Sequence, residues 1–176
     1  YTNRDLLLDF TGDLVQKSVT YHKRLNTDTE KIVTELFDYD SQNRLLTHRH
    51  QVDNNPVEIL AQNDYNELSQ IRSQKVGGTD SAVPLQTIDY NYNIQGWLTK
   101  VNNPQNLGTK LFAYELKFNN PSNTNLSGPS FNGNIAEMDW IYANGDGLKR
   151  YSYQYDAMGR LLSGIYSEPN ASIPEN

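Results

Sequence analysis

The sequence predicts an all-β fold in which stacked antiparallel β-hairpins form an open repeat sheet. Three observations support this prediction. A short strand–turn–strand motif recurs along the chain, aromatic residues alternate with other residues before most of its turns, and apolar positions show no helical period. One hairpin alone is marginally stable in water, so we expect neighbouring hairpins to bury a shared face by pairing with one another.

The motif reads apolar, any, apolar, Asx, any, any, Gly or Asn, any, aliphatic. Each copy predicts one hairpin, and in chain order the copies occupy residues 6–14, 37–45, 60–68, 90–98, 130–135 and 153–161. Before the turns, spacings of two place pairs of rings on one face of a strand. The clearest pairs are Phe37 with Tyr39, Tyr90 with Tyr92, and Tyr153 with Tyr155.

Turn chemistry explains two columns of the motif. The first turn position holds a short polar residue in each copy: Asp9, Asp40, Asn63, Asn93, Ser130 and Asp156. Such side chains accept hydrogen bonds from the backbone two residues on. Three positions later the copies hold Gly12, Asn43, Asn66, Gly96, Gly133 and Gly159. A hairpin turn with a bulge needs a left-handed residue there, so we predict positive φ at Asn43 and Asn66.

Longer intervals between copies predict exposed connections. These are residues 76–84, 102–109 and 119–130, which are rich in Gly, Ser, Asn and Pro. The Asn-Gly-Asp-Gly run at residues 144–147 predicts one further tight hairpin. Residues 167–176 form a polar tail. No change in composition divides the chain, so we expect one repeat region over residues 1–176, with about six hairpins.

Composition excludes several classes of function. The net charge is −6 and the pI about 5.0, which argues against binding a nucleic-acid backbone. No apolar run approaches the roughly 20 residues that span a bilayer. Without cysteine there is no disulfide framework and no thiolate metal site. No nucleotide or phosphate-loop motif is present, so we expect no cofactor.

Two patterns weakly suggest metal sites. His48 and His50 share a strand face, but Arg49 lies between them and no third ligand is evident, so a polar strand face is the favoured interpretation. Asp38, Asp40 and Gln42 resemble the start of a calcium loop. The required Gly and the bidentate Glu are missing, so turn capping is favoured there.

No pair of carboxylates is marked for hydrolysis. Asp9, Asp40 and Asp156 already have a role as turn residues, and the acids Glu35, Glu67, Glu115 and Glu137 occur singly. We therefore expect the chain to be non-catalytic and keep a hydrolase as a third alternative.

Exposed aromatic residues leave a binding function open. Trp97 and Trp140 are candidate sugar-stacking platforms, although a role in the packing between strands is favoured. Arg44 and Arg160 follow the turn residue and are expected to stack on a tyrosine of a neighbouring repeat.

Three copies resemble the repeat of the YD-repeat, or rearrangement-hotspot (Rhs), family. They are residues 37–45, 90–98 and 153–161, which read Phe-x-Tyr-Asp-x-x-Asn-Arg-Leu, Tyr-x-Tyr-Asn-x-x-Gly-Trp-Leu and Tyr-x-Tyr-Asp-x-x-Gly-Arg-Leu. The resemblance implies a fragment of the repeat region of a large, secreted or surface-exposed bacterial protein, with teneurins and insecticidal toxin-complex subunits as relatives. Strands of such proteins spiral into a β-shell around a C-terminal toxin. The sequence has no counterpart of the family's self-cleaving segment or of a toxin domain.

The leading expectation is therefore a structural segment of such a shell, with other repeats and domains of a parent protein as its partners. The alternative is a carbohydrate or cell-surface binding module that uses exposed aromatics and Asn-rich loops, with glycans as partners. We also expect self-association through the leucine-rich strand at residues 6–8, or folding of that strand under the 119–130 loop. Lys149, Arg150, Pro169 and Pro174 are expected to protect the C-terminal edge.

Overall fold

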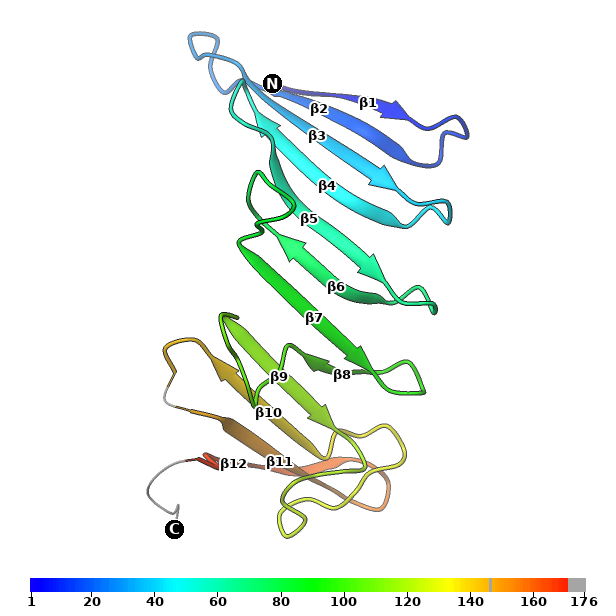
Figure 1. Cartoon of the computed structure of the whole chain (residues 1–176), viewed down its shortest axis with the longest axis vertical. Helices are drawn as coiled ribbons and strands as arrows, with labels where there is room; N and C mark the ends of the chain where they lie inside the picture. The colour runs from blue at the N-terminus through cyan, green and yellow to red at the C-terminus, as the bar shows by residue number, and fades with distance from the viewer. Residues whose placement is uncertain (146, 171–176) are drawn as a thin grey trace. The chain divides into compact units, whose positions relative to one another are not determined.

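The computed structural model describes residues 1–145 and 147–170. Within these ranges the chain forms twelve β-strands and no helix, so no helix there could cross a membrane. Strand order follows chain order, and the pairings between consecutive strands are antiparallel, as Figure 1 traces from β1 to β12. The predicted all-β fold of antiparallel hairpins is confirmed.

The contacts divide the chain into two compact units, Tyr1–Ile88 and Asp89–Asn176. The first unit contains six complete strands, which are β1 (Thr2–Leu8), β2 (Val15–His22), β3 (Lys31–Tyr39), β4 (Leu45–Val52), β5 (Glu58–Tyr65) and β6 (Ile71–Val76). Strand β7 (Gln86–Tyr92) begins in the first unit and ends in the second. The sequence shows no change in composition at this boundary, and the single repeat region stays a prediction.

The second unit continues with β8 (Leu98–Val101), β9 (Phe112–Lys117), β10 (Glu137–Tyr142), β11 (Lys149–Tyr155) and β12 (Leu161–Ser167). The predicted loops fall in the connections that follow β6, β8 and β9, except that Val76 still belongs to β6. The run predicted to form a further hairpin lies between β10 and β11, where Asn144 and Gly147 have φ values of 63° and 122°. The described part of the chain excludes residues 146 and 171–176. The second of these ranges belongs to the predicted polar tail and includes Pro174.

Four turns are built with the same four hydrogen bonds. At Asp40, the backbone N–H donates to the Arg44 carbonyl, and the Asn43 N–H donates to the Asp40 carbonyl. The Asp40 carboxylate accepts from the N–H groups of Gln42 and Arg44, at 2.8 and 3.0 Å. The equivalent bonds occur in the turns that open at Asn66, Asn93 and Asp156.

The first hairpin uses a longer version of this turn. The Asp9 N–H donates to the carbonyl of Leu14, one residue further along than in the other turns. The Asp9 carboxylate accepts from the N–H groups of Asp13 and Leu14. Gly12 has a φ of 81°, in the left-handed region that the motif requires.

The left-handed column is confirmed at Asn43, Gly96 and Gly159, whose φ values are 61°, 81° and 78°. Two residues later the second strand starts, and the ladder shifts by one residue there, for example between Asp38 and Tyr39. The extra residue is a bulge, which lets the turn follow the right-handed twist of the strands.

The third copy of the motif was predicted three residues out of register. Asn66 opens the turn and does not have positive φ; the left-handed residue is Ser69, with a φ of 62°. Asn63 belongs to β5, where its side-chain amide donates to the Leu45 carbonyl at 3.0 Å. Two Asn residues three apart, followed by an apolar Leu68, imitate the motif, whereas Ser is a rare occupant of the left-handed position.

The fifth predicted copy is not a hairpin turn between two strands. Ser130 and Gly133 lie inside the long connection between β9 and β10, here called the 118–136 connection. The Ser130 hydroxyl donates to Asn132 Oδ1 at 2.7 Å, and this oxygen also accepts from the Asn134 N–H at 3.1 Å. The side chain that caps this bend is therefore Asn132. Gly133 does have positive φ, 93°.

Strand β1 pairs with β2, and its three leucines are exposed: Leu6 by 52%, Leu7 by 57% and Leu8 by 43%. The predicted covering of this strand by the 119–130 loop, which belongs to the other unit, stays a prediction. Self-association through this edge stays a prediction.

Candidate functional site: a buried charge network

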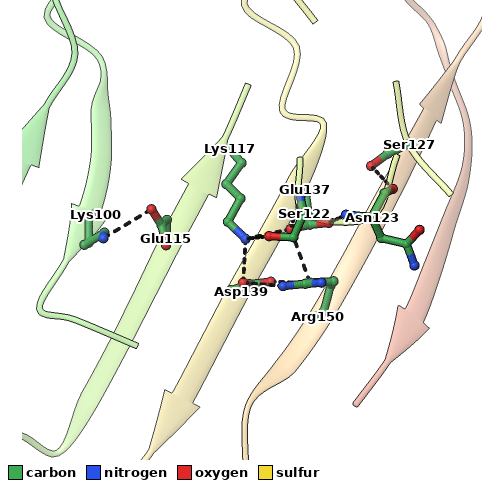
Figure 2. A network of polar contacts seen from close by, with 9 residues as sticks. All are labelled: Lys100, Glu115, Lys117, Ser122, Asn123, Ser127, Glu137, Asp139 and Arg150. Carbon is green, nitrogen blue, oxygen red and sulfur yellow. Dashed lines mark hydrogen bonds and ion pairs between the residues drawn. The ribbon is translucent and has the colours of Figure 1, made fainter. Parts of the chain in front are cut away.

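The most buried large side chains of the described residues are acidic. Glu137 and Asp139 of β10 both have 0% exposure. The antiparallel register places Glu137 opposite Lys117 of β9, and Asp139 opposite Arg150 of β11. Since strand side chains alternate between faces, these residues share one face of the sheet in the second unit. Figure 2 shows the four side chains converging, and we call them the buried charge network.

Lys117 bridges the two carboxylates. Its Nζ donates to Glu137 Oε1 and to Asp139 Oδ2, each at 2.7 Å, and to the Ser122 hydroxyl at 2.6 Å. An ammonium group has three protons to donate, so this cation is fully satisfied. Its side chain is almost completely buried, and its three bonds are made to groups of the protein.

Arg150 closes the network from the other side. Its Nε donates to Asp139 Oδ1 at 2.6 Å, and its Nη2 donates to Asp139 Oδ2 at 2.8 Å. This is a bidentate pair, the geometry in which a guanidinium binds a carboxylate most strongly. Arg150 Nε also lies 3.2 Å from Glu137 Oε1. The prediction that Arg150 protects an edge is wrong, because β11 is an inner strand and the side chain is buried there.

The network also fixes the 118–136 connection. Glu137 accepts hydrogen bonds from the backbone N–H of Ser122 at 3.1 Å and from that of Asn123 at 3.0 Å. Figure 2 shows these two residues beside the carboxylate. A second, less buried pair lies on the same face, between Lys100 and Glu115 at 3.2 Å. The long connection is therefore held against β10 by charge-assisted bonds.

The electrostatics favour four charged groups. Burial works to raise the pKa of Glu137, but hydrogen bonds from Lys117, Ser122 and Asn123 outweigh it and lower that pKa. For Asp139 burial is likewise outweighed, by Arg150 and then Lys117, so its pKa is also lowered. The hydrogen bond to Asp139 raises the pKa of Arg150. Two cations and two anions cancel, which is the condition under which burying charge is tolerable.

This arrangement suits a structural role. Every carboxylate oxygen of Glu137 and Asp139 already accepts at least one hydrogen bond. A general acid needs a raised pKa and access to substrate, whereas these groups are ionised and enclosed. What the network does is join three strands to one long connection. Beside the network, opposite Glu137 on β11, the Ser152 hydroxyl is buried and has no hydrogen-bond partner among the described residues.

The opposite face of these strands is aromatic. Trp140 stacks with Tyr151 at a centroid distance of 5.5 Å and lies 6.1 Å from Tyr166. Trp140 therefore packs between strands, which was the favoured interpretation. Trp97 follows a turn, lies 5.1 Å from the ring of Phe118, and remains 38% exposed. Trp97 borders an open hollow together with Phe118 and Phe131.

The two histidines contact different carboxylates. His48 contacts Glu35 at 3.1 Å and stacks on Phe37, while His50 contacts Glu58 at 3.0 Å. In the described residues no group of three or more His, Asp and Glu side chains could hold a metal ion. Each imidazole has its own carboxylate partner, which matches the interpretation as a polar strand face.

The calcium-like pattern is likewise resolved into other contacts. The Asp40 carboxylate caps its turn and also accepts from Arg44 Nε at 2.7 Å. Asp38 forms an ion pair with Arg49 at 2.6 Å. Neither carboxylate is thus available in the arrangement that a calcium loop requires.

The predicted arginine stacking holds at Arg44, whose guanidinium carbon lies 4.6 Å from the ring centre of Tyr65 in the next hairpin. Such a contact contributes about 0.5–2 kcal/mol. Arg160 instead pairs with Asp156 at 2.7 Å while its side chain is largely exposed.

The sequence pattern does not mark the buried charge network. Glu137 and Glu115 read as single acids, and Lys117 and Asp139 carry no motif. One signal was present: Glu137 and Asp139 alternate with Met138 and Trp140, so both faces of β10 carry residues that need partners. The cations that complete the network lie 20 and 11 residues away in sequence, beyond the reach of local periodicity.

No family model matches the chain, and no curated protein matches it. Among solved structures it is similar to "Crystal Structure of TcdB2-TccC3 without hypervariable C-terminal region", with 18% identity, a TM-score of 0.44, and coverage of 85% of this chain. For "Crystal Structure of TcdB2-TccC3-TEV" the identity is 17%, the TM-score 0.43 and the coverage 87%. The chain spans 10% of the length of each of these solved chains.

Proposed function

We propose that this chain is a non-catalytic structural segment of an exported bacterial YD-repeat or Rhs-type protein. In that parent it forms part of the wall of a β-shell that encapsulates or presents a toxin or effector domain. Its partners are then the neighbouring repeats, which continue the sheet beyond its two edge strands, together with the enclosed domain.

The observation that carries this proposal is the repetition of one turn. Four hairpins close with the same four hydrogen bonds, opened at Asp40, Asn66, Asn93 and Asp156. Two of these turns, at Asp40 and Asp156, belong to the copies with the closest resemblance to the family repeat. Repetition of one supersecondary unit, each pairing with the next, is how a wall of arbitrary extent is built.

The non-catalytic part of the proposal rests on what the acidic groups do. The turn aspartates are bonded to backbone N–H groups, and the two enclosed acids are paired with Lys117 and Arg150. Export is proposed from the family resemblance alone.

The test uses the full-length product of the gene that encodes this chain. Limited trypsin digestion, with fragments identified by mass spectrometry, should leave a second region of the product uncut until the sheet is unfolded by urea. Electron microscopy of the same preparation should show a hollow particle. Asp139→Ala should make the protected region cleavable, because it breaks the network that joins β9, β10 and β11.

The matched control is Asp89→Ala, which removes an exposed ion pair with Lys110 in the same unit. It should leave the protected region uncut. Cleavage of all regions at similar rates in the wild-type product, or particles without an internal space, would contradict the proposal.

A further inference from the structure

A tyrosine hydroxyl ties neighbouring hairpins together at three places in the described structure. Each tyrosine lies directly before the residue that opens a turn, and its hydroxyl donates to a backbone carbonyl of the preceding part of the sheet. The three bonds run from Tyr39 to Val15 at 3.1 Å, from Tyr65 to Leu45 at 2.9 Å, and from Tyr155 to Ile135 at 2.8 Å. The acceptor residue lies at, or just before, the start of a strand.

At one of these places an arginine adds a second contact to the tyrosine. Arg44 Nε donates to Asp40 Oδ2 at 2.7 Å, which holds the arginine beside its own turn. The guanidinium carbon then lies 4.6 Å from the ring centre of Tyr65, and the Arg44 side chain is 26% exposed. Tyr65 thus contacts the preceding hairpin through its ring, on Arg44, and through its hydroxyl, on the Leu45 carbonyl. We call Arg44 and Leu45 a tyrosine-receiving pair.

The last hairpin carries the same pair without a tyrosine. Arg160 and Leu161 occupy the motif positions of Arg44 and Leu45, and Arg160 Nε donates to Asp156 Oδ2 at 2.7 Å. The Arg160 side chain is 74% exposed and Leu161 is 59% exposed. Among the described residues β12 pairs only with β11, no ring lies over Arg160, and no side chain donates to the Leu161 carbonyl. The turn therefore holds this second pair in position while its outer side is open.

The opposite edge of the sheet cannot supply the missing tyrosine. In the first hairpin the residue directly before the turn is Leu8, because Asp9 opens that turn. Leucine has neither a hydroxyl to donate nor a ring on which an arginine could stack. The β1 edge of a second copy would thus leave both members of the pair at β12 without their contacts. The partner that fits is a hairpin whose first strand ends in Tyr followed by Asp or Asn.

We propose that the β12 edge binds a further hairpin of this motif, whose tyrosine stacks on Arg160 and donates to the Leu161 carbonyl. The established interface between β4 and β5 provides the geometry, since Tyr65 makes both contacts there. This pairing rests on the wall role proposed above and names the partner at one edge of the wall. It also makes the two edges chemically unlike, because β12 receives a tyrosine and β1 offers none.

The experiment uses a labelled peptide of residues 58–76, which form β5, its turn and β6 and include Tyr65. Its fluorescence anisotropy is measured as the complete chain is added, and we expect saturable binding with a millimolar or lower Kd. The affinity is modest because a single hairpin is marginally stable and must fold as it binds. The Tyr65→Phe peptide should bind about 2-fold to 12-fold more weakly, the effect of one hydrogen bond. The Tyr65→Leu peptide, which imitates Leu8, should bind more weakly still.

Variants of the complete chain locate the binding site. Arg160→Ala should weaken binding of the Tyr65 peptide by about 2-fold to 30-fold, the effect of one cation–π contact. It should also reduce the difference between the Tyr65 and Tyr65→Leu peptides, because the ring has lost its partner. Arg72→Ala is the matched control, since Arg72 is also an exposed arginine paired with an aspartate. It should leave the Kd unchanged, and an unchanged Tm of both variants shows that the fold is retained.

A fusion keeps the test decisive if the free peptide folds poorly. The same hairpin is joined to the C-terminus of the complete chain, with residues 168–176 as the linker. This linker is longer than the 53–57 segment that joins β4 to β5, and a short tether supplies a millimolar effective concentration. The fusion with Tyr65 should have a higher Tm than the Tyr65→Leu fusion, and Arg160→Ala should remove the difference.

Three outcomes would overturn the proposal. The first is the absence of peptide binding together with equal Tm values of the two fusions. The second is binding of the Tyr65→Leu peptide as tight as that of the Tyr65 peptide. The third is an equal effect of Arg160→Ala and Arg72→Ala. If the full-length product still shields a region from trypsin in any of these cases, the wall role stands and only the assigned partner of β12 is lost.

Discussion

At the scale of single residues, Asp and Asn open the turns with the same hydrogen bonds but different charge. Asp40 and Asp156 accept backbone N–H bonds through a carboxylate, and Asn66 and Asn93 accept the equivalent bonds through a neutral carboxamide. Bonding to the charged form lowers a carboxyl pKa. The backbone N–H of Arg44 accordingly lowers the pKa of Asp40, and that of Arg160 lowers the pKa of Asp156.

Acid should therefore weaken the aspartate turns before the asparagine turns. A carboxyl group whose pKa is lowered on folding adds stability that is complete above its unfolded pKa, about 3.9, and is lost as pH falls through its folded pKa. The double variant Asp40→Asn, Asp156→Asn should keep its turns, and its Tm should fall less than that of the wild type between about pH 5 and pH 2. Thermal scans by circular dichroism across this range measure the difference.

Asn66→Asp is the reverse control. It should steepen the acid-dependent fall in Tm, because it adds a carboxylate that accepts the same backbone bonds. If Tm fell equally steeply with pH in the wild type and in both variants, protonation of the turn carboxylates would not be coupled to unfolding.

Gly159 is required by its backbone conformation, with a φ of 78°, and by the nearby Asn134 side chain, 3.3 Å from where a Cβ would lie. Gly159→Val should destabilise the chain by about 1 kcal/mol or more, because β-branched residues tolerate the left-handed region poorly. Gly128→Val is the control, since Gly128 has neither a positive φ nor any atom within 4 Å of an added Cβ. Urea unfolding should separate the two variants, and an unchanged midpoint for Gly159→Val would count against the turn.

The residue pattern predicted most of these turns because their hydrogen bonds are local. The bonds that close the turns at Asp40 and Asp156 join residues of the same turn, so spacing alone identifies them. The error at Asn66 has the same local origin. Two overlapping readings of residues 63–71 satisfied the motif, and the choice between them depends on pairing across β5 and β6, where Tyr65 faces Ile71.

At the scale of elements, the main feature is the junction of β9, β10 and β11 with the connection above them. Its charged residues lie on three different strands, and the irregular 118–136 connection packs against them. The residue spacing within one strand predicts neither the charged partner on the next strand nor the loop that packs against it. The alternation in β10 indicated a face that needs partners, but only the register reveals that Lys117 and Arg150 supply them.

Removing one member of this network should be costly. Asp139→Ala removes the bidentate partner of Arg150 and leaves Glu137 as the one carboxylate facing both enclosed cations. We expect the free energy of unfolding of the second unit to fall by about 3–5 kcal/mol. Asp89→Ala, which loses only the exposed pair with Lys110, should change it by about 1 kcal/mol or less. Urea unfolding followed by the fluorescence of Trp140 and Trp97 reports on this unit. If both variants lost a similar free energy of unfolding, the buried charge network would not be what holds β9, β10 and β11 together.

At the scale of the whole chain, the all-β class followed from period-two aromatics and repeated turn chemistry, which are properties of sequence alone. The sequence alone does not predict whether the outer strands of the sheet are paired or covered on their free side. Strand β1 pairs with β2 on one side, and its leucines are exposed. Unpaired strand edges with apolar side chains recruit further strands.

We therefore expect the isolated chain to self-associate through β1. Its mass, measured by size-exclusion chromatography with light scattering, should rise with concentration. Leu7→Glu should abolish this rise, because it places a charge on the edge while facing Lys17 across the strand pair. Leu25→Glu, at an exposed leucine outside any strand, should not. A wild-type chain that stays monomeric over the dilution series would contradict the expectation.

The sequential strand order has a mechanical consequence. From β1 to β6, each strand is bonded to the next strand in the chain. Tension on the two ends of this run would load the ladder bonds of an outer strand one after another, so the sheet would peel from its edge instead of shearing as a block. Optical-tweezer extension should record a succession of small, low-force steps, each releasing about one strand. A single high-force rupture would show that the strands share the load.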